Sequence, residues 1–181
     1  RLNDAGYSLG ILFRRCPVDF STRYDAVLKE YKDCIVAVAP KWKKQGADWN
    51  TILPTKADLQ LLVNTIFHTE LVINLGSSMV FDYAALGKPC AYIRYDVPNC
   101  PEPDWSVQKI YNFIHFRSMP TKLAVYWLDS PEATDEVITR MMSEDCNEVV
   151  GHAQVWFDKI NQSPANKAAD RIWNAFDELL K

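Results

Sequence analysis

The sequence predicts an α/β fold, a Rossmann-like parallel sheet with helices on both faces. Short apolar runs alternate with segments of helical periodicity, and one of these runs stops at a glycine directly before a short helix. Crossovers from strand to helix to strand connect parallel strands, so this alternation predicts a sheet that helices cover on both sides. A chain of 181 residues, 48% of them hydrophobic and 24% charged, is long enough for a single domain that spans residues 1–181.

Apolar runs with the length of buried strands occur at residues 9–13, 35–39, 71–75, 90–95 and 124–128. Apolar residues at helical spacing predict helices at residues 24–31, 55–68, 79–86, 107–117, 131–142, 152–160 and 166–180. The last two form the C-terminal helices of residues 151–181. Residues 40–54 show no clear periodicity and residues 96–104 contain three prolines, so both segments are expected to be loops.

Cap residues support several of these helices. Thr55, with Asp58 three residues later, resembles a capping box at the start of one helix. Ser130, Pro131 and Glu132 follow the order of cap, proline and acid that is typical of a helix start.

The strongest candidate site is the turn after residues 71–75. Gly76 ends the apolar run, Ser77 and Ser78 stand where an N-cap belongs, and Gly87 with the following proline closes a helix of about two turns. The free amides at the helix start, including that of Met79, predict a site for a phosphate group. The alternative is that the serines only cap the helix.

Three further residues are expected near this turn. Arg14, Arg15 and Cys16 follow the first strand, and ligands of open parallel sheets bind beyond the carboxyl ends of the strands. The two guanidinium groups can bind a phosphate in a bidentate manner, although a surface pair that holds acidic partners is the alternative. Asp82, one helical turn beyond Ser78, can accept hydrogen bonds from a ribose, or it is a solvated helical acid.

Charge and motifs exclude several classes of function. The net charge is −3 and no basic run exceeds two residues, which argues against binding to nucleic acid or to an acidic membrane. The chain has no G-x-G-x-x-G, Walker, H-E-x-x-H or G-x-S-x-G motif, and its three histidines are spread too widely for a histidine metal site. Five cysteines without a C-x-x-C pair, and the lack of an apolar stretch of about 20 residues, predict a cytoplasmic protein.

One segment resembles a known family: Gly76-Ser77-Ser78-Met79-Val80-Phe81-Asp82-Tyr83-Ala84-Ala85-Leu86-Gly87-Lys88-Pro89. It is similar to the S-S-x-x-F-D-x-A-x-x-x-K-P segment in the C-terminal, donor-binding half of GT-B-fold glycosyltransferases that build surface polysaccharides. These include the CDP-glycerol glycerophosphotransferases and, more loosely, the bacterial capsule polysialyltransferases. The turn at His115 and Arg117 also looks like this family. The resemblance implies one half of a GT-B fold.

The upstream Arg14-Arg15-Cys16-Pro17 looks like the R-P-H-P motif of the same families. Arg15 replaces the proline, and Cys16 replaces a histidine that is implicated in binding the donor phosphate or in protonating the leaving group. A neutral thiol is a poorer substitute for that role, which puts catalysis by this half in doubt but leaves nucleotide binding as an expectation.

The resemblance implies a metal-independent glycosyltransferase whose nucleotide-sugar donor is a substrate, with no bound cofactor. It places an N-terminal acceptor domain before Arg1, so the chain is expected to be part of a larger, two-domain protein that associates peripherally with a membrane. The donor-binding residues implied are Arg14, Arg15, Cys16, Gly76, Ser77, Ser78, Met79, Asp82, His115 and Arg117. Two alternatives stay open: a sugar-nucleotide epimerase of the same fold, and a non-catalytic nucleotide-binding or interaction domain.

Overall fold

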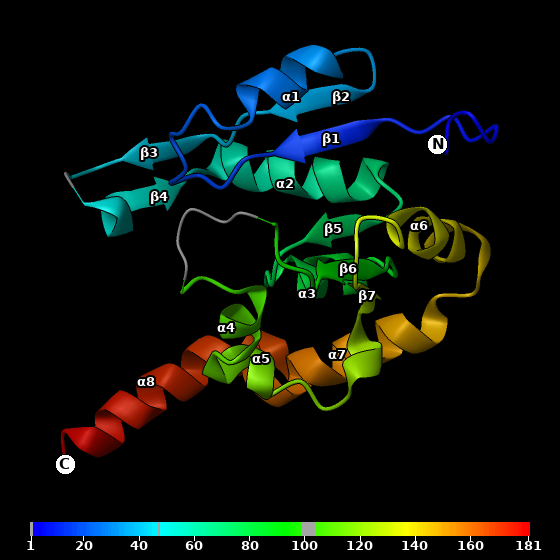
Figure 1. Cartoon of the computed structure of the whole chain (residues 1–181). Coiled ribbons are helices and arrows are strands. Elements are labelled where there is room, and N and C mark those ends of the chain that lie inside the picture. Colours follow the sequence, from blue (N-terminus) through cyan, green and yellow to red (C-terminus); the bar gives the residue numbers. More distant parts are fainter. Residues whose placement is uncertain (1, 47, 99–103) are drawn as a thin grey trace. The chain divides into compact units, whose positions relative to one another are not determined.

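The protein is a mixed α/β structure made of two compact units. The computed structural model describes residues 2–46, 48–98 and 104–181. One unit is Arg1–His68 and the other is Thr69–Lys181 (Figure 1).

The first unit begins with two parallel strands joined by a helix. Strand β1 (Ile11–Arg14) pairs with β2 (Ile35–Val38), and helix α1 (Asp25–Glu30) lies between them in the sequence. The predicted strands and helix are therefore confirmed. Arg14 is the last residue of β1 rather than the first residue after it, so Arg15 and Cys16 are the residues that leave the carboxyl end of this strand.

The prediction of a long loop at residues 40–54 is wrong. Strand β3 (Trp42–Lys44) pairs antiparallel with β4 (Ile52–Pro54), and a short 3-10 turn, η1 (Trp49–Thr51), precedes β4. Trp42–Lys44 contains two lysines and Ile52–Pro54 ends in a proline, so neither segment lies in an apolar run as long as those that predicted the other strands. Helix α2 (Lys56–His68) follows, as predicted.

The second unit holds a parallel sheet with the strand order β5-β6-β7. Strands β5 (Val72–Asn74), β6 (Cys90–Ile93) and β7 (Tyr126–Leu128) lie within the runs predicted as strands, and α3 (Met79–Ala84) is the predicted short helix between the first two.

The crossover from β6 to β7 differs from its prediction. Helix α4 (Val107–Tyr111), helix α5 (Ile114–Arg117) and the 3-10 turn η2 (Lys122–Ala124) replace a single expected helix. The break falls at Phe113, whose backbone is extended. The predicted loop at residues 96–104 falls in large part outside the described residues.

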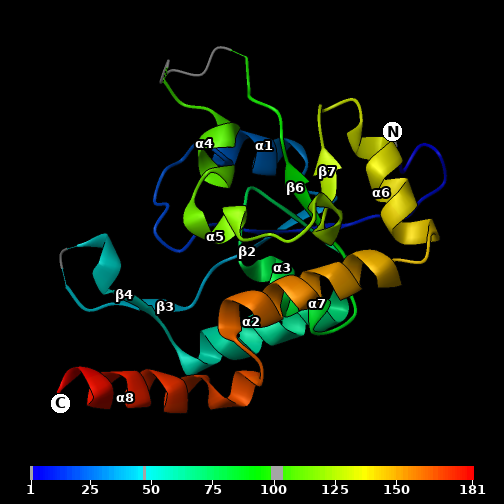
Figure 2. The same cartoon turned by 90° about the horizontal axis from the view of Figure 1, so that it is seen from below.

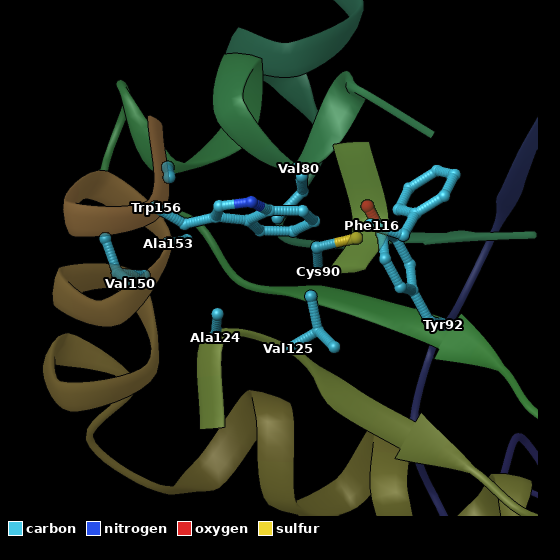
Figure 3. Close-up of a cluster of buried hydrophobic side chains, with 10 residues drawn as sticks. Val80, Cys90, Tyr92, Phe116, Ala124, Val125, Val150, Ala153 and Trp156 are labelled. Carbon is cyan, nitrogen blue, oxygen red and sulfur yellow. The ribbon is translucent and has the colours of Figure 1, made fainter. Parts of the chain in front are cut away.

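Helices cover both faces of this sheet. Cys90 and Tyr92 point into a cluster with α3, α5 and α7 (Asn147–Asn161), whereas Ala91, between them in β6, packs with α6 (Thr134–Ser143) on the opposite face. Helix α7 (Asn147–Asn161) runs beside α3 (Figure 2), and its Trp156 reaches the centre of the first cluster (Figure 3). The C-terminal elements are α6 (Thr134–Ser143), η3 (Ala165–Lys167) and α8 (Ala168–Leu179).

The last two features concern the cysteines and the possibility of a membrane-spanning helix. Cys16, Cys34, Cys90 and Cys146 are free thiols, and Cys100 lies outside the described residues. Within residues 2–46, 48–98 and 104–181, no helix combines the length and the apolar character needed to cross a membrane.

Candidate functional site

A cavity of about 380 Å³ lies at the carboxyl ends of the two parallel strands of the first unit. Arg15, Cys16 and Pro17 line it directly after β1, and Pro40 lines it after β2. Asp19, Phe20, Trp42, Lys44 and Ile52 complete the wall, so the hairpin β3–β4 forms one side of the cavity. This size is in the range of small-molecule sites, and the wall combines two cations with aromatic surface.

Charged groups in this wall are held by their neighbours. The guanidinium of Arg15 donates to the backbone oxygen of Ser21 at 2.8 Å and to the carboxylate of Asp25 at 3.2 Å. The hydroxyl and amide of Ser21 lower the pKa of Asp19 to about 2, and Arg23 contributes in the same direction. The wall therefore presents an ionised carboxylate as well as the cations Arg15 and Lys44.

Arg14 lies one residue before this wall and forms a buried ion pair. Its Nη2 donates to both carboxylate oxygens of Asp58, at 3.0 and 2.8 Å. Its Nη1 is buried and has no hydrogen-bond partner among the described residues. The interpretation of Arg14 as one of a pair with an acidic partner agrees with this geometry, but the partner is buried rather than exposed.

The turn after β5 is the second candidate site and belongs to the second unit. Gly76 has a φ of +53°, and a Cβ atom there would meet Ile110 Cγ2 at 2.6 Å and Phe116 Cζ at 3.1 Å. The Ser77 hydroxyl accepts a hydrogen bond from the Met79 amide at 3.2 Å, which agrees with the alternative that the serines cap the helix. The expectation of a free Met79 amide is therefore wrong. Ser78 occupies the N-cap position without a side-chain capping bond.

A buried tyrosine holds this turn through a hydrogen bond. The Tyr92 hydroxyl donates to the Ser77 backbone oxygen at 2.6 Å. Burial raises the pKa of Tyr92, so its hydroxyl stays a neutral donor. Asp82 is exposed on α3, and partial desolvation raises the pKa of its carboxyl group.

Helix α5 brings one more predicted residue, His115, close to the turn. The ring of Phe116 lies against Gly76, and the His115 ring packs on Phe116 with centroids 4.1 Å apart. Arg117, the residue after Phe116, is exposed. The structure thus places His115 one side chain away from the strand-to-helix turn.

The predicted site residues divide between the two units. Arg14, Arg15 and Cys16 lie together in the first unit, and the other seven lie in the second. Their arrangement on one common edge therefore stays a prediction. Sequence reasoning missed Phe20, Trp42, Lys44 and Asp58. The only signal for Trp42 and Lys44 was their place beyond a strand end, where loops commonly contact ligands.

Two further findings concern metal binding and similarity to known proteins. In the described part of the chain, no three His, Cys, Asp or Glu side chains gather as a metal site needs. No family model, no curated protein and no solved structure matches the chain.

Proposed function

We propose that this chain is the nucleotide-sugar-binding half of a GT-B-fold glycosyltransferase that acts in surface polysaccharide or glycan biosynthesis. The observation that carries the proposal is the cavity of about 380 Å³ beyond the carboxyl ends of β1 and β2. Ligands of parallel α/β sheets bind at this edge. Arg15 and Lys44 offer charge to a diphosphate, while Phe20 and Trp42 offer apolar surface.

The Rossmann-like arrangement is part of this proposal. Parallel strands joined by helical crossovers in each unit support it, as does a sheet in the second unit that is buried on both faces. In the second unit we propose that Gly76, Ser77, Ser78 and Met79 hold phosphate, that Asp82 orients ribose, and that His115 and Arg117 complete that site. The family resemblance of residues 76–89 supports these roles.

A second candidate function follows from Cys16. Its thiol lines the cavity at the position where the resemblance implies a histidine. A thiol donates weakly to phosphate, which favours a nucleotide-binding domain without catalysis. Turnover by the full-length protein separates the candidates, because it gives sugar transfer, epimerisation or neither.

The proposal includes the setting of the full-length protein. It comprises an N-terminal acceptor domain, a cytoplasmic location with peripheral membrane association, and a nucleotide-sugar donor as substrate rather than cofactor. Nucleic acid is not among the proposed partners.

Calorimetric titration of the chain with UDP, CDP, GDP and CMP tests the proposal. At least one diphosphate is expected to bind, and Arg15→Gln and Lys44→Gln should each weaken it about tenfold, because charge-assisted hydrogen bonds contribute about 1.5–3 kcal/mol. Lys159→Gln, an exposed charge on α7, is the matched control and should leave the affinity unchanged. No binding of any of the four nucleotides at millimolar concentration would contradict the proposal.

The same titration tests metal independence. The cations Arg15 and Lys44 line the cavity, and each can donate charge-assisted hydrogen bonds to a phosphate without a metal ion. We expect EDTA to leave the nucleotide affinity unchanged. A loss of affinity that magnesium or manganese restores would show that a metal ion takes part in donor binding.

A further inference from the structure

Asp58 is a buried carboxylate that joins three elements of the first unit. It is only 2% exposed at the start of α2. One oxygen accepts from the Lys41 amide at 2.7 Å, the other accepts from Trp42 Nε1 at 2.6 Å, and both accept from Arg14 at the end of β1. Burial alone would raise the pKa of Asp58, but these donors outweigh it and the pKa is lowered.

Trp42 is the link between this carboxylate and the cavity. It lines the cavity wall, whereas Asp58, which receives its indole N–H, does not. A second hydrogen bond ties the same segment to α2, because the Thr55 hydroxyl donates to the Lys41 oxygen at 2.6 Å. The indole is therefore anchored by a carboxylate that does not line the cavity.

We infer that Asp58 is a positioning residue that holds Trp42 as the stacking wall for the base of a bound nucleotide. This inference rests on the proposed function. The wall also includes Phe20, Pro40 and Ile52, which suit a flat, weakly polar ring, and it carries the cations Arg15 and Lys44, which we assign to the phosphates. An indole fixed before binding loses little freedom when the base arrives, so anchoring it increases affinity.

The test compares a nucleotide with a ligand that lacks a base. The full chain and its variants are titrated with CDP, UDP and inorganic pyrophosphate by calorimetry, and urea unfolding reports the stability of each variant separately. Trp42→Ala is expected to weaken the binding of CDP and UDP about tenfold or more, which is the effect of losing one base–aromatic stack. The affinity for pyrophosphate should stay unchanged.

Two variants test the hydrogen bond from Trp42 to Asp58 by itself. Trp42→Phe keeps a ring but removes the N–H, and Asp58→Asn removes the charge that receives it. Each variant is expected to weaken CDP binding about threefold to tenfold and to leave pyrophosphate binding unchanged. The reason is that a ring without this hydrogen bond loses conformational freedom when the base binds. Trp173→Phe and Asp177→Asn, both at exposed positions of α8, are the matched controls and should bind as the wild type does.

The outcomes separate the two proposals. If the wild type binds none of UDP, CDP, GDP and CMP, the proposed function fails. If the wild type binds CDP and Trp42→Ala binds it equally well, or if the losses for CDP and pyrophosphate are equal, the positioning role of Asp58 is overturned while the proposed function stands. If Asp58→Asn does not fold, Trp42→Phe decides, because it leaves the contacts of Asp58 with Arg14 and Lys41 in place.

Discussion

Gly76 shows how one residue shapes the turn between β5 and α3. Its φ of +53° is a left-handed conformation, which costs an L-residue about 1–2 kcal/mol. In addition, an added Cβ would meet Ile110 Cγ2 at 2.6 Å, closer than real Cβ contacts. The backbone and the packing therefore both favour glycine here, which agrees with its place at the end of the apolar run.

We predict that Gly76→Ala lowers the free energy of unfolding by about 2–5 kcal/mol, the sum of about 1–2 kcal/mol for backbone strain and about 1–3 kcal/mol for overpacking. Gly87→Ala is the matched control, since Gly87 has a φ of +72° and no atom within 4 Å of an added Cβ. It should lose only the backbone contribution of about 1–2 kcal/mol. Urea unfolding measures both variants, and equal losses would show that Ile110 and Phe116 move aside without cost.

Cys16 offers a second test at the residue scale, because it lines the cavity where the family resemblance implies histidine. An imidazole there would donate a hydrogen bond to a phosphate oxygen, and a charge-assisted one when protonated. We predict that Cys16→His strengthens nucleotide binding about tenfold at low pH. The histidine pKa rises beside a phosphate, so the gain is complete below about pH 6.5 and is lost as the pH rises through the raised pKa.

Calorimetry with CDP between about pH 5.5 and 8 covers roughly one unit or more on either side of the imidazole pKa. Cys34→His serves as the control, since Cys34 does not line the cavity. A folded Cys16→His variant that binds no better at any of these pH values would sink the assignment of Cys16 to the phosphate-binding position.

At the scale of elements, the start of α2 shows where sequence reasoning stops. The spacing of Thr55 and Asp58 predicts a capping box, and half of it forms, because the Asp58 amide donates to the Thr55 hydroxyl at 3.2 Å. The Asp58 carboxylate instead binds Arg14, which lies 44 positions earlier, and the segment at Lys41 and Trp42. Local spacing predicts a cap but carries no information about such distant partners.

The pH dependence of stability tests this junction. Because the pKa of Asp58 is lowered in the folded state, its contribution is complete above the unfolded pKa of about 3.9 and is lost as the pH falls through the lower, folded pKa. We predict that Asp58→Asn is about 3 kcal/mol less stable than the wild type at pH 7, and that the gap narrows below about pH 4.

Urea unfolding at several pH values measures this gap. Asp129→Asn is the control, because Asp129 pairs with Arg94 on the surface, where an ion pair contributes at most about 1 kcal/mol. A gap between the wild type and Asp58→Asn that is the same at pH 7 and pH 3 would contradict an ionised Asp58 as the source of the stability.

At the scale of the whole molecule, periodicity predicted more of the fold than of the site. The parallel strands and most helices followed from apolar spacing, whereas β3 and β4 did not, because neither lies in a long apolar run and each forms through pairing with the other. The strand-to-helix turn at Ser77 was predicted from its cap residues. The cavity wall at Phe20, Trp42 and Lys44 was not, since it is assembled from separate segments whose proximity only the folded chain defines.

Buried side chains are distributed unevenly between the two units. Both clusters of buried hydrophobic residues, around Tyr92 and around Leu128, lie in Thr69–Lys181. In the described part of Arg1–His68, the buried hydrophobic residues are Ile52 and Ile66. A segment of this length rarely gains more than about 3–5 kcal/mol even from a complete core.

We therefore predict that the fragment 69–181 folds by itself and that the fragment 1–68 does not. In urea, the larger fragment should unfold in one cooperative transition with a free energy on the order of 5 kcal/mol, and the smaller one should show no such transition. Trp156→Ala is the control, because Trp156 is 1% exposed in the larger cluster and its loss costs about 3–5 kcal/mol. This variant should remove most of the stability of the fragment 69–181. A sharp transition in the fragment 1–68, or an unchanged one in Trp156→Ala, would mean that stability does not follow the buried clusters.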